Sequence, residues 1–158
     1  MPASRLLKTC ALAAVAATAL TAGAARAEDC DGAPTTTRLI VQVDGVHSSN
    51  GLMAITLYPD DPDRFLRRHG SLKVVRVPAK GPTTEACLYL PAPGGYGVAV
   101  YHDENGNRHL DKNGLLPAEG SGLSNNPSVS LFHLPSLKNS RFLTHVGENR
   151  IEIRLRYP

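Results

Sequence analysis

The sequence predicts an all-β fold: a β-sandwich of about seven strands with one short helix and a long ordered loop. Twelve Pro and fourteen Gly, spread through 158 residues, disfavour a helical bundle, whereas a hydrophobic content of 42% disfavours disorder. Runs of β-branched and apolar residues recur between turn residues, as is typical of short strands.

The N-terminus has the three parts of a secretory signal. Basic residues open it, an apolar run follows over residues 10–22, and residues 25–27 form a small-x-small cleavage site. This run is shorter than the roughly 20 residues that a membrane-spanning helix needs. We therefore expect a signal peptide over residues 1–27, cleaved between Ala27 and Glu28, and a periplasmic or secreted protein. An uncleaved anchor is the alternative interpretation.

The remaining chain, residues 28–158, suits a single domain with no membrane span. The excess of 17 Lys and Arg over 14 Asp and Glu comes entirely from Arg5, Lys8 and Arg26, so this domain is neutral. A neutral domain lacks the basic surface that binds nucleic acid or an anionic membrane. With no Trp, five Tyr and three Phe, it also has few side chains on which sugars or bases would stack.

Two cysteines remain after the signal peptide, Cys30 in a polar leader and Cys87 in a strand-like run. In an oxidising compartment such a pair most often forms a disulfide. The bond would attach the N-terminus to the sheet. A catalytic thiol is the alternative, but neither cysteine lies in a C-x-x-C motif.

The first strand signals lie early in the domain. Residues 37–43 are rich in β-branched side chains, and residues 51–58 form a second apolar run that ends at Pro59. The short polar segment His47–Gly51 between them predicts a hairpin. The short helix is expected over residues 61–70.

The predicted helix has signals at both ends. Asp61 can cap its N-terminus, Pro62 suits its first turn and Gly70 can close it. Further strands are expected over residues 72–77, 86–90, 96–101, 128–132, 142–146 and 150–157. In the last of these, apolar and charged residues alternate, so one face is buried and one is wet. Residues 114–127 are expected to form the long ordered loop.

A polar loop follows directly on the strand predicted over residues 96–101. Side-chain oxygens fall at positions 1, 3, 5 and 9 of an EF-hand-type loop, and the main-chain oxygen of one residue falls at position 7. These positions are occupied by Asp103, Asn105, Asn107, Asp111 and, at position 7, His109. Since Ca²⁺ takes six to eight oxygens, we expect a weak calcium site here, with Glu119 as a further ligand.

Two positions depart from that calcium motif. Arg108 stands where the motif has Gly, and Gly114 where it has a bidentate Glu. The alternative is a metal-free loop in which Asp and Asn side chains bond their own backbone as Asx-turns.

An enzymatic interpretation rests on the same segment. His102 and His109, with Asp103 and Asp111, offer nitrogen and oxygen ligands for a transition metal in a hydrolase. Motifs of nucleophilic hydrolases, P-loop proteins, dinucleotide-binding proteins and zinc peptidases are absent from the sequence. We therefore assign no catalytic residue and expect a protein that is not an enzyme.

Three segments together resemble a known family. They read LPAPGGYGVAVYHDENGN (90–107), LDKN (110–113) and PAEGSGLSNN (117–126). They are similar to the core "YAvavfHDeNgNgkLDtn…PkEgyGfSNN" of a family of small exported bacterial proteins catalogued only as a domain of unknown function. The resemblance implies an immunoglobulin-like or prealbumin-like β-sandwich and no established activity. Gly97 replaces the usual Ala, and Arg108 replaces a common Gly, which weakens the calcium argument.

The expected function is therefore that of a non-enzymatic module. Loops at the end of a β-sandwich commonly bind partners, so the loop over residues 103–111 would serve a cell-envelope or extracellular partner. We also expect residues 117–126 to fold back over this loop as a cap. A metal-dependent hydrolase using residues 102–111 is the alternative, and a purely structural domain is a third possibility.

Overall fold

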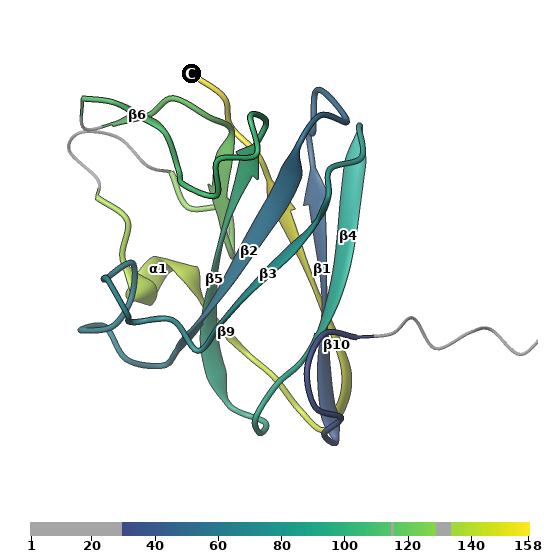
Figure 1. Ribbon diagram of the computed structural model, residues 1–158. Coiled ribbons are helices and arrows are strands. Elements are labelled where there is room, and N and C mark those ends of the chain that lie inside the picture. Colours follow the sequence, from purple (N-terminus) through teal and green to yellow (C-terminus); the bar gives the residue numbers. More distant parts are fainter. Residues whose placement is uncertain (1–29, 115, 129–133) are drawn as a thin grey trace, which may run out of the picture.

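The computed structural model describes residues 30–158 except 115 and 129–133. Within them the chain forms two packed β-sheets, a small two-stranded sheet and one short helix, so the predicted all-β sandwich is confirmed (Figure 1). The elements are β1 (Thr37–Asp44), β2 (Leu52–Pro59), β3 (Lys73–Pro78), β4 (Thr83–Tyr89), β5 (Gly95–Asp103), β6 (Lys112–Asn113), β7 (Leu116–Pro117), β8 (Ser121–Leu123), α1 (Leu137–Ser140), β9 (Arg141–Leu143) and β10 (Gly147–Arg154). The predicted signal peptide and most of the strand predicted over residues 128–132 lie outside the described residues.

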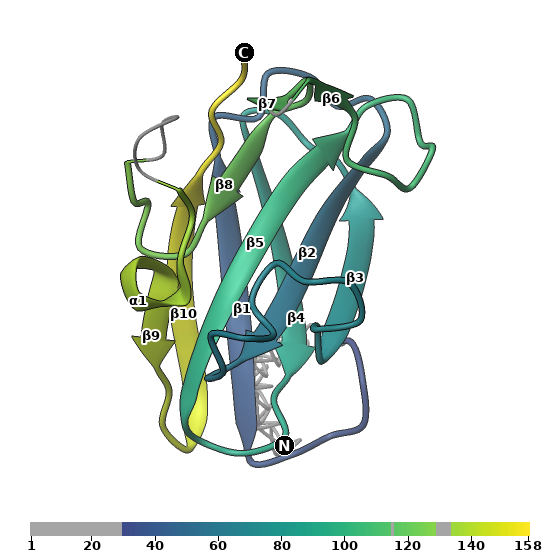
Figure 2. The ribbon, with the colours of Figure 1, turned by 90° about the vertical axis from the view of Figure 1, so that its left-hand side faces the viewer.

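One sheet has the strand order β10-β1-β4, and the other has the order β3-β2-β5-β8. The first and last strands of the fold, β1 and β10, pair in parallel over their full lengths. Strands β8 and β9 pair with different parts of the β5 edge that β2 leaves free. Figure 2 faces this second sheet, with α1 and the segment after β2 lying over it.

The core lies between the sheets and is built from alternate residues of the strands. In β1, Thr37, Leu39, Val41 and Val43 are fully buried, as period-2 alternation requires. The last strand keeps its predicted alternation, since Ile153 is buried while its two neighbours are exposed. A smaller cluster of Tyr58, Phe65 and Leu137 covers the outer face of the β5 sheet.

The disulfide between Cys30 and Cys87 is present, as predicted, and joins residues 57 apart in the sequence. It attaches the leader to β4. Backbone bonds beside it extend this attachment, because Asp31 donates to the Cys87 carbonyl at 2.9 Å and accepts from the Tyr89 amide at 3.0 Å. Among the described residues, no helix is both long enough and apolar enough to cross a bilayer.

Two local predictions are wrong. The segment after β1 is not a hairpin turn, because β1 and β2 belong to different sheets and the connection crosses between them. Residues 61–70 form consecutive turns rather than a helix. Asp61 does bond the Asp63 amide at 2.9 Å, but Leu66 and His69 adopt φ of 57° and 59°, which a right-handed helix excludes.

The predicted irregular loop also contains strands. Residues 114–127 include β7, which pairs with β6, and β8, which pairs with β5. Strand β8 is only three residues long and holds Gly122, so it carries too little alternation to be recognised. A Cβ on Gly122 would lie 2.7 Å from Ile153 Cγ2, so this close approach to β10 requires Gly.

Candidate functional site

At the end of β5, two fully buried polar side chains lie on opposite faces of the sheet. His102 continues the inward row of Val98 and Val100, whereas Asp103, the next residue, points to the other face. These are the last two residues of β5, and this strand ends on the side of the sandwich that holds β6 and the C-terminus (Figure 1). Two polar clusters therefore share one end of the molecule.

The first cluster is the loop over residues 103–111, and Asp103 anchors it. One carboxylate oxygen, Oδ2, accepts from the Arg108 amide at 2.8 Å. The other, Oδ1, is buried and has no hydrogen-bond partner among the described residues. Arg108 itself adopts φ of 65°, so it takes up the left-handed conformation for which the calcium motif uses Gly.

Three further predicted ligands of this loop lie together. The side-chain amides of Asn105 and Asn107 donate to the Asp111 carboxylate at 2.7 Å and 3.0 Å. Their oxygens accept from the backbone amides of Asn107 and His109, at 3.0 Å and 2.8 Å. These are Asx-turns, the bonds expected of the metal-free alternative. The His109 side chain has no part in them.

Residues 118–120 fold back over this loop. The buried Glu119 accepts from the Asp111 amide at 3.1 Å, and the Ala118 amide donates to the Asp111 carbonyl at 2.8 Å. The Gly120 carbonyl accepts from the His102 amide at 2.8 Å. Glu119 thus reaches the end of the loop that Asp111 closes. The rest of the expected cap over residues 117–126 does not bond the loop, because Ser124, Asn125 and Asn126 bond β5, β9 and β10 instead.

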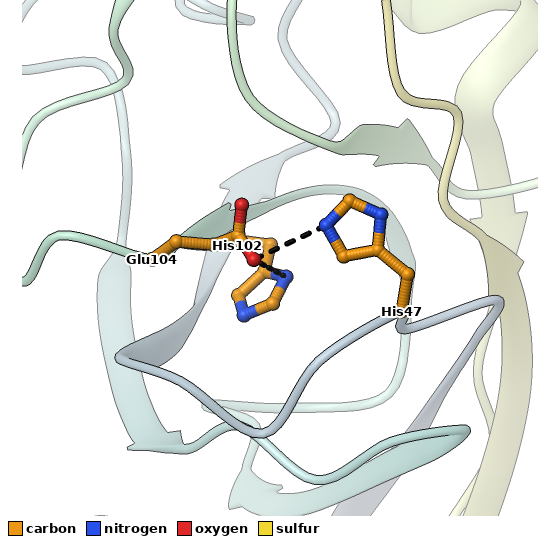
Figure 3. A group of neighbouring side chains, drawn as sticks. All are labelled: His47, His102 and Glu104. Atoms are coloured by element: carbon orange, nitrogen blue, oxygen red, sulfur yellow. Dashed lines mark hydrogen bonds and ion pairs between the residues drawn. The ribbon is translucent and has the colours of Figure 1, made fainter.

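The second cluster consists of His47, His102 and Glu104 (Figure 3). His47 Nε2 lies 3.1 Å from Glu104 Oε1, and His102 Nδ1 lies 3.9 Å from the same oxygen. One donor atom from each residue lies within 4.8 Å of the other two. His47 comes from the β1–β2 connection, and the other two residues come from the end of β5.

Hydrogen bonds fix the orientation of His102. Its Nε2 lies 2.8 Å from the Asn50 carbonyl oxygen, which only accepts, so Nε2 carries a hydrogen. In the neutral ring Nδ1 is then the acceptor, and the Tyr157 hydroxyl donates to it at 2.8 Å. The Tyr157 ring also stacks on His47 with centroids 3.6 Å apart.

The electrostatics of this cluster follow from its contacts. The Ser48 hydroxyl donates to Glu104 Oε1 at 2.6 Å and, with the neighbouring histidines, holds the pKa of that carboxyl below its ordinary value. Burial raises the pKa of Tyr157. The result is an ionised carboxylate beside a protonated phenol.

The structure does not bring the four residues of the predicted enzymatic site together. His102 turns toward His47 and Glu104, not toward His109 and Asp111. In the part of the protein that the structure describes, His47, His102 and Glu104 form the only group of three or more His, Cys, Asp or Glu whose donor atoms lie so close. Sequence reasoning missed His47 and Glu104, because the two residues lie 57 positions apart in the sequence.

Fold and site together define a small β-sandwich protein with one internal disulfide and two polar clusters at one end. A family model matches residues 41–152, most of the sequence, and its description is "Uncharacterized protein conserved in bacteria (DUF2141)". The chain belongs to this family. No curated protein and no solved structure is significantly similar to it.

Proposed function

We propose that this protein is an exported, non-enzymatic module in which Ca²⁺ binds weakly to the loop over residues 103–111. The bound ion would order this end of the sandwich for contact with a cell-envelope or extracellular partner. The disulfide supports export, because such bonds persist mainly in oxidising compartments.

The observation that carries the calcium proposal is the state of Asp103. Its side chain is fully buried, yet Oδ1 has no partner within the described residues. A buried polar atom left without a hydrogen bond costs about 1–3 kcal/mol, and more when its group is charged. A hard cation beside Oδ1 would remove that cost, and carboxylate oxygens are the ligands that Ca²⁺ prefers.

The other ligands would come from the same loop. Asp111 already faces Asn105 and Asn107, but their amide nitrogens point at it, so both amides must rotate to present oxygen to an ion. The His109 carbonyl and Glu119 complete the proposed set. Because binding replaces existing hydrogen bonds, we expect a Kd in the range of about 10⁻⁴–10⁻³ M seen in extracellular modules.

Thermal unfolding tests this proposal. The protein is first treated with EDTA and then given about 10 mM Ca²⁺ or Mg²⁺. A ligand that binds only the folded state stabilises it by RT ln(1 + [L]/Kd), here about 1.4 to 2.7 kcal/mol. The unfolding midpoint should therefore rise by several degrees with Ca²⁺, and by less with Mg²⁺, which demands stricter octahedral geometry.

Three variants sharpen the test. Asp103→Asn keeps the shape of the side chain and removes its charge, so the calcium response should disappear. Arg108→Gly removes the side chain from a left-handed position and should retain the response. Asp63→Asn changes an exposed carboxylate outside the loop and serves as the control. A midpoint that Ca²⁺ does not move in the unmodified protein would mean that the Asx-turns alone hold the loop.

A further inference from the structure

We propose that His47, His102 and Glu104 form a second metal site, one that binds a divalent transition-metal ion of the Zn²⁺ or Cu²⁺ type. Imidazole nitrogen suits these ions, whereas Ca²⁺ prefers oxygen alone. Glu104 lies within the calcium loop, but the two sites share no ligand, and His102 and Asp103 point to opposite faces of the β5 sheet.

The spacing of the three donor atoms fits such an ion. Zn–N and Zn–O bonds of about 2.0–2.2 Å place tetrahedral ligands roughly 3.3–3.6 Å apart. The distances from Glu104 Oε1 to His47 Nε2 and His102 Nδ1, 3.1 Å and 3.9 Å, lie on either side of that range. Both histidine nitrogens thus lie near the same carboxylate oxygen (Figure 3).

Surrounding groups already orient two of the three ligands. The Asn50 carbonyl takes the Nε2 hydrogen of His102 and so leaves the Nδ1 lone pair as the donor. A backbone carbonyl on the second ring nitrogen is a common feature of metal-binding histidines. The Ser48 hydroxyl likewise holds the Glu104 carboxylate at 2.6 Å. This combination of a fixed ring and a fixed carboxylate distinguishes the cluster from scattered surface residues.

The site is open to solvent on one side. The side chains of His47 and Glu104 are 52% and 37% exposed, whereas His102 is fully buried at the end of the core. An ion can therefore reach the exposed pair and be held by the rigid third ligand. It displaces the Tyr157 hydroxyl from His102 Nδ1, and three protein ligands leave a coordination position for water or a partner's side chain.

Calorimetric titration of the untagged full-length protein with ZnCl₂, after removal of metals with EDTA, tests the site. We expect one equivalent of zinc to bind. Replacing a ligand should weaken binding more than the loss of an outer-shell contact, which costs about 10- to 100-fold. His47→Ala and Glu104→Gln should therefore each raise the Kd at least about 10-fold. His109→Ala, which alters a neighbouring exposed histidine, should leave it unchanged.

A second measurement reports on the metal's ligands directly. Co²⁺ replaces Zn²⁺ in such sites, and its visible d–d absorption should appear in the unmodified protein and be lost in His47→Ala. Asp103→Asn should retain zinc binding even if it abolishes the calcium response, so the two proposals fail independently. No zinc binding, or an equal Kd in His47→Ala and the unmodified protein, would overturn the site.

Discussion

At Gly97, the irregular segments that cover the β5 sheet pack directly against the backbone of β5. An added Cβ would lie 2.8 Å from Leu137 Cδ1 and 2.9 Å from Phe65 Cε2. Both neighbours are buried, so neither can move aside freely. The space beside Gly97 is already filled by α1 and by the turns after β2.

Gly97→Ala should therefore destabilise the protein by about 1–3 kcal/mol, the usual cost of overpacking a filled core. Urea unfolding measures it. Gly94→Ala is the matched control, because a Cβ at Gly94 meets nothing within 4 Å. We expect that control to be neutral or slightly stabilising, since Ala restricts the unfolded state. A Gly97→Ala protein as stable as the original would show that Leu137 and Phe65 can repack.

At the same residue scale, the sequence located one of the two polar clusters. The loop from Asp103 to Asp111 was predictable because its Asp and Asn residues follow one another at fixed spacing. His47 and Glu104 were not, because only the packing of the β1–β2 connection against the end of β5 brings them together. Local spacing identifies a loop, whereas a site built from distant segments needs the fold.

At the scale of elements, the turns after β2 are tied to β9 by an ion pair. Arg141 Nε donates to Asp60 Oδ1 at 2.7 Å, and this bond lowers the pKa of the Asp60 carboxyl. Because the folded pKa lies below that of the unfolded state, about 3.9, the pair stabilises the fold above that pH. Its contribution is lost as the pH falls further, through the folded value.

Arg141→Gln should therefore lower the urea midpoint slightly at about pH 7 and by less at about pH 2.5. The effect at neutral pH should also shrink in high salt, since both side chains are solvent-exposed. Arg68→Gln is the control, because Arg68 makes no ion pair within the described part of the protein. If Arg141→Gln lowers the urea midpoint equally at both pH values, Arg141 acts through packing instead.

Element prediction failed where tertiary contacts decide the backbone. The helix signals at residues 61–70 were real, since Asp61 caps the first turn, but the segment must turn back so that Phe65 covers Tyr58. The T-shaped contact between these rings, whose centroids lie 5.2 Å apart, stabilises that backbone conformation. The six-residue and longer strands, by contrast, followed from their own composition within a few residues.

For the whole molecule, the sequence predicted two layers but not the membership of each sheet. Strands β1 and β10 pair in parallel although most of the sequence separates them, and no local pattern encodes such a pairing. The consequence is a fold in which the first and last strands meet in one sheet. Its leader is held by the disulfide and a short bridge to β4, and by an ion pair between Asp31 and Lys73 of β3.

The stability of the whole molecule should therefore depend on the redox state of its compartment. In the chain-entropy treatment of cross-links, joining residues 57 apart stabilises the fold by about 4 kcal/mol. A Cys30→Ser and Cys87→Ser double variant should lose up to that amount in urea unfolding. Dithiothreitol should lower the midpoint of the unmodified protein to the same value and leave the double variant unchanged. Equal midpoints for the oxidised protein and the variant would mean that the noncovalent contacts of the leader suffice to hold it, and that an oxidising compartment is not needed for a stable fold.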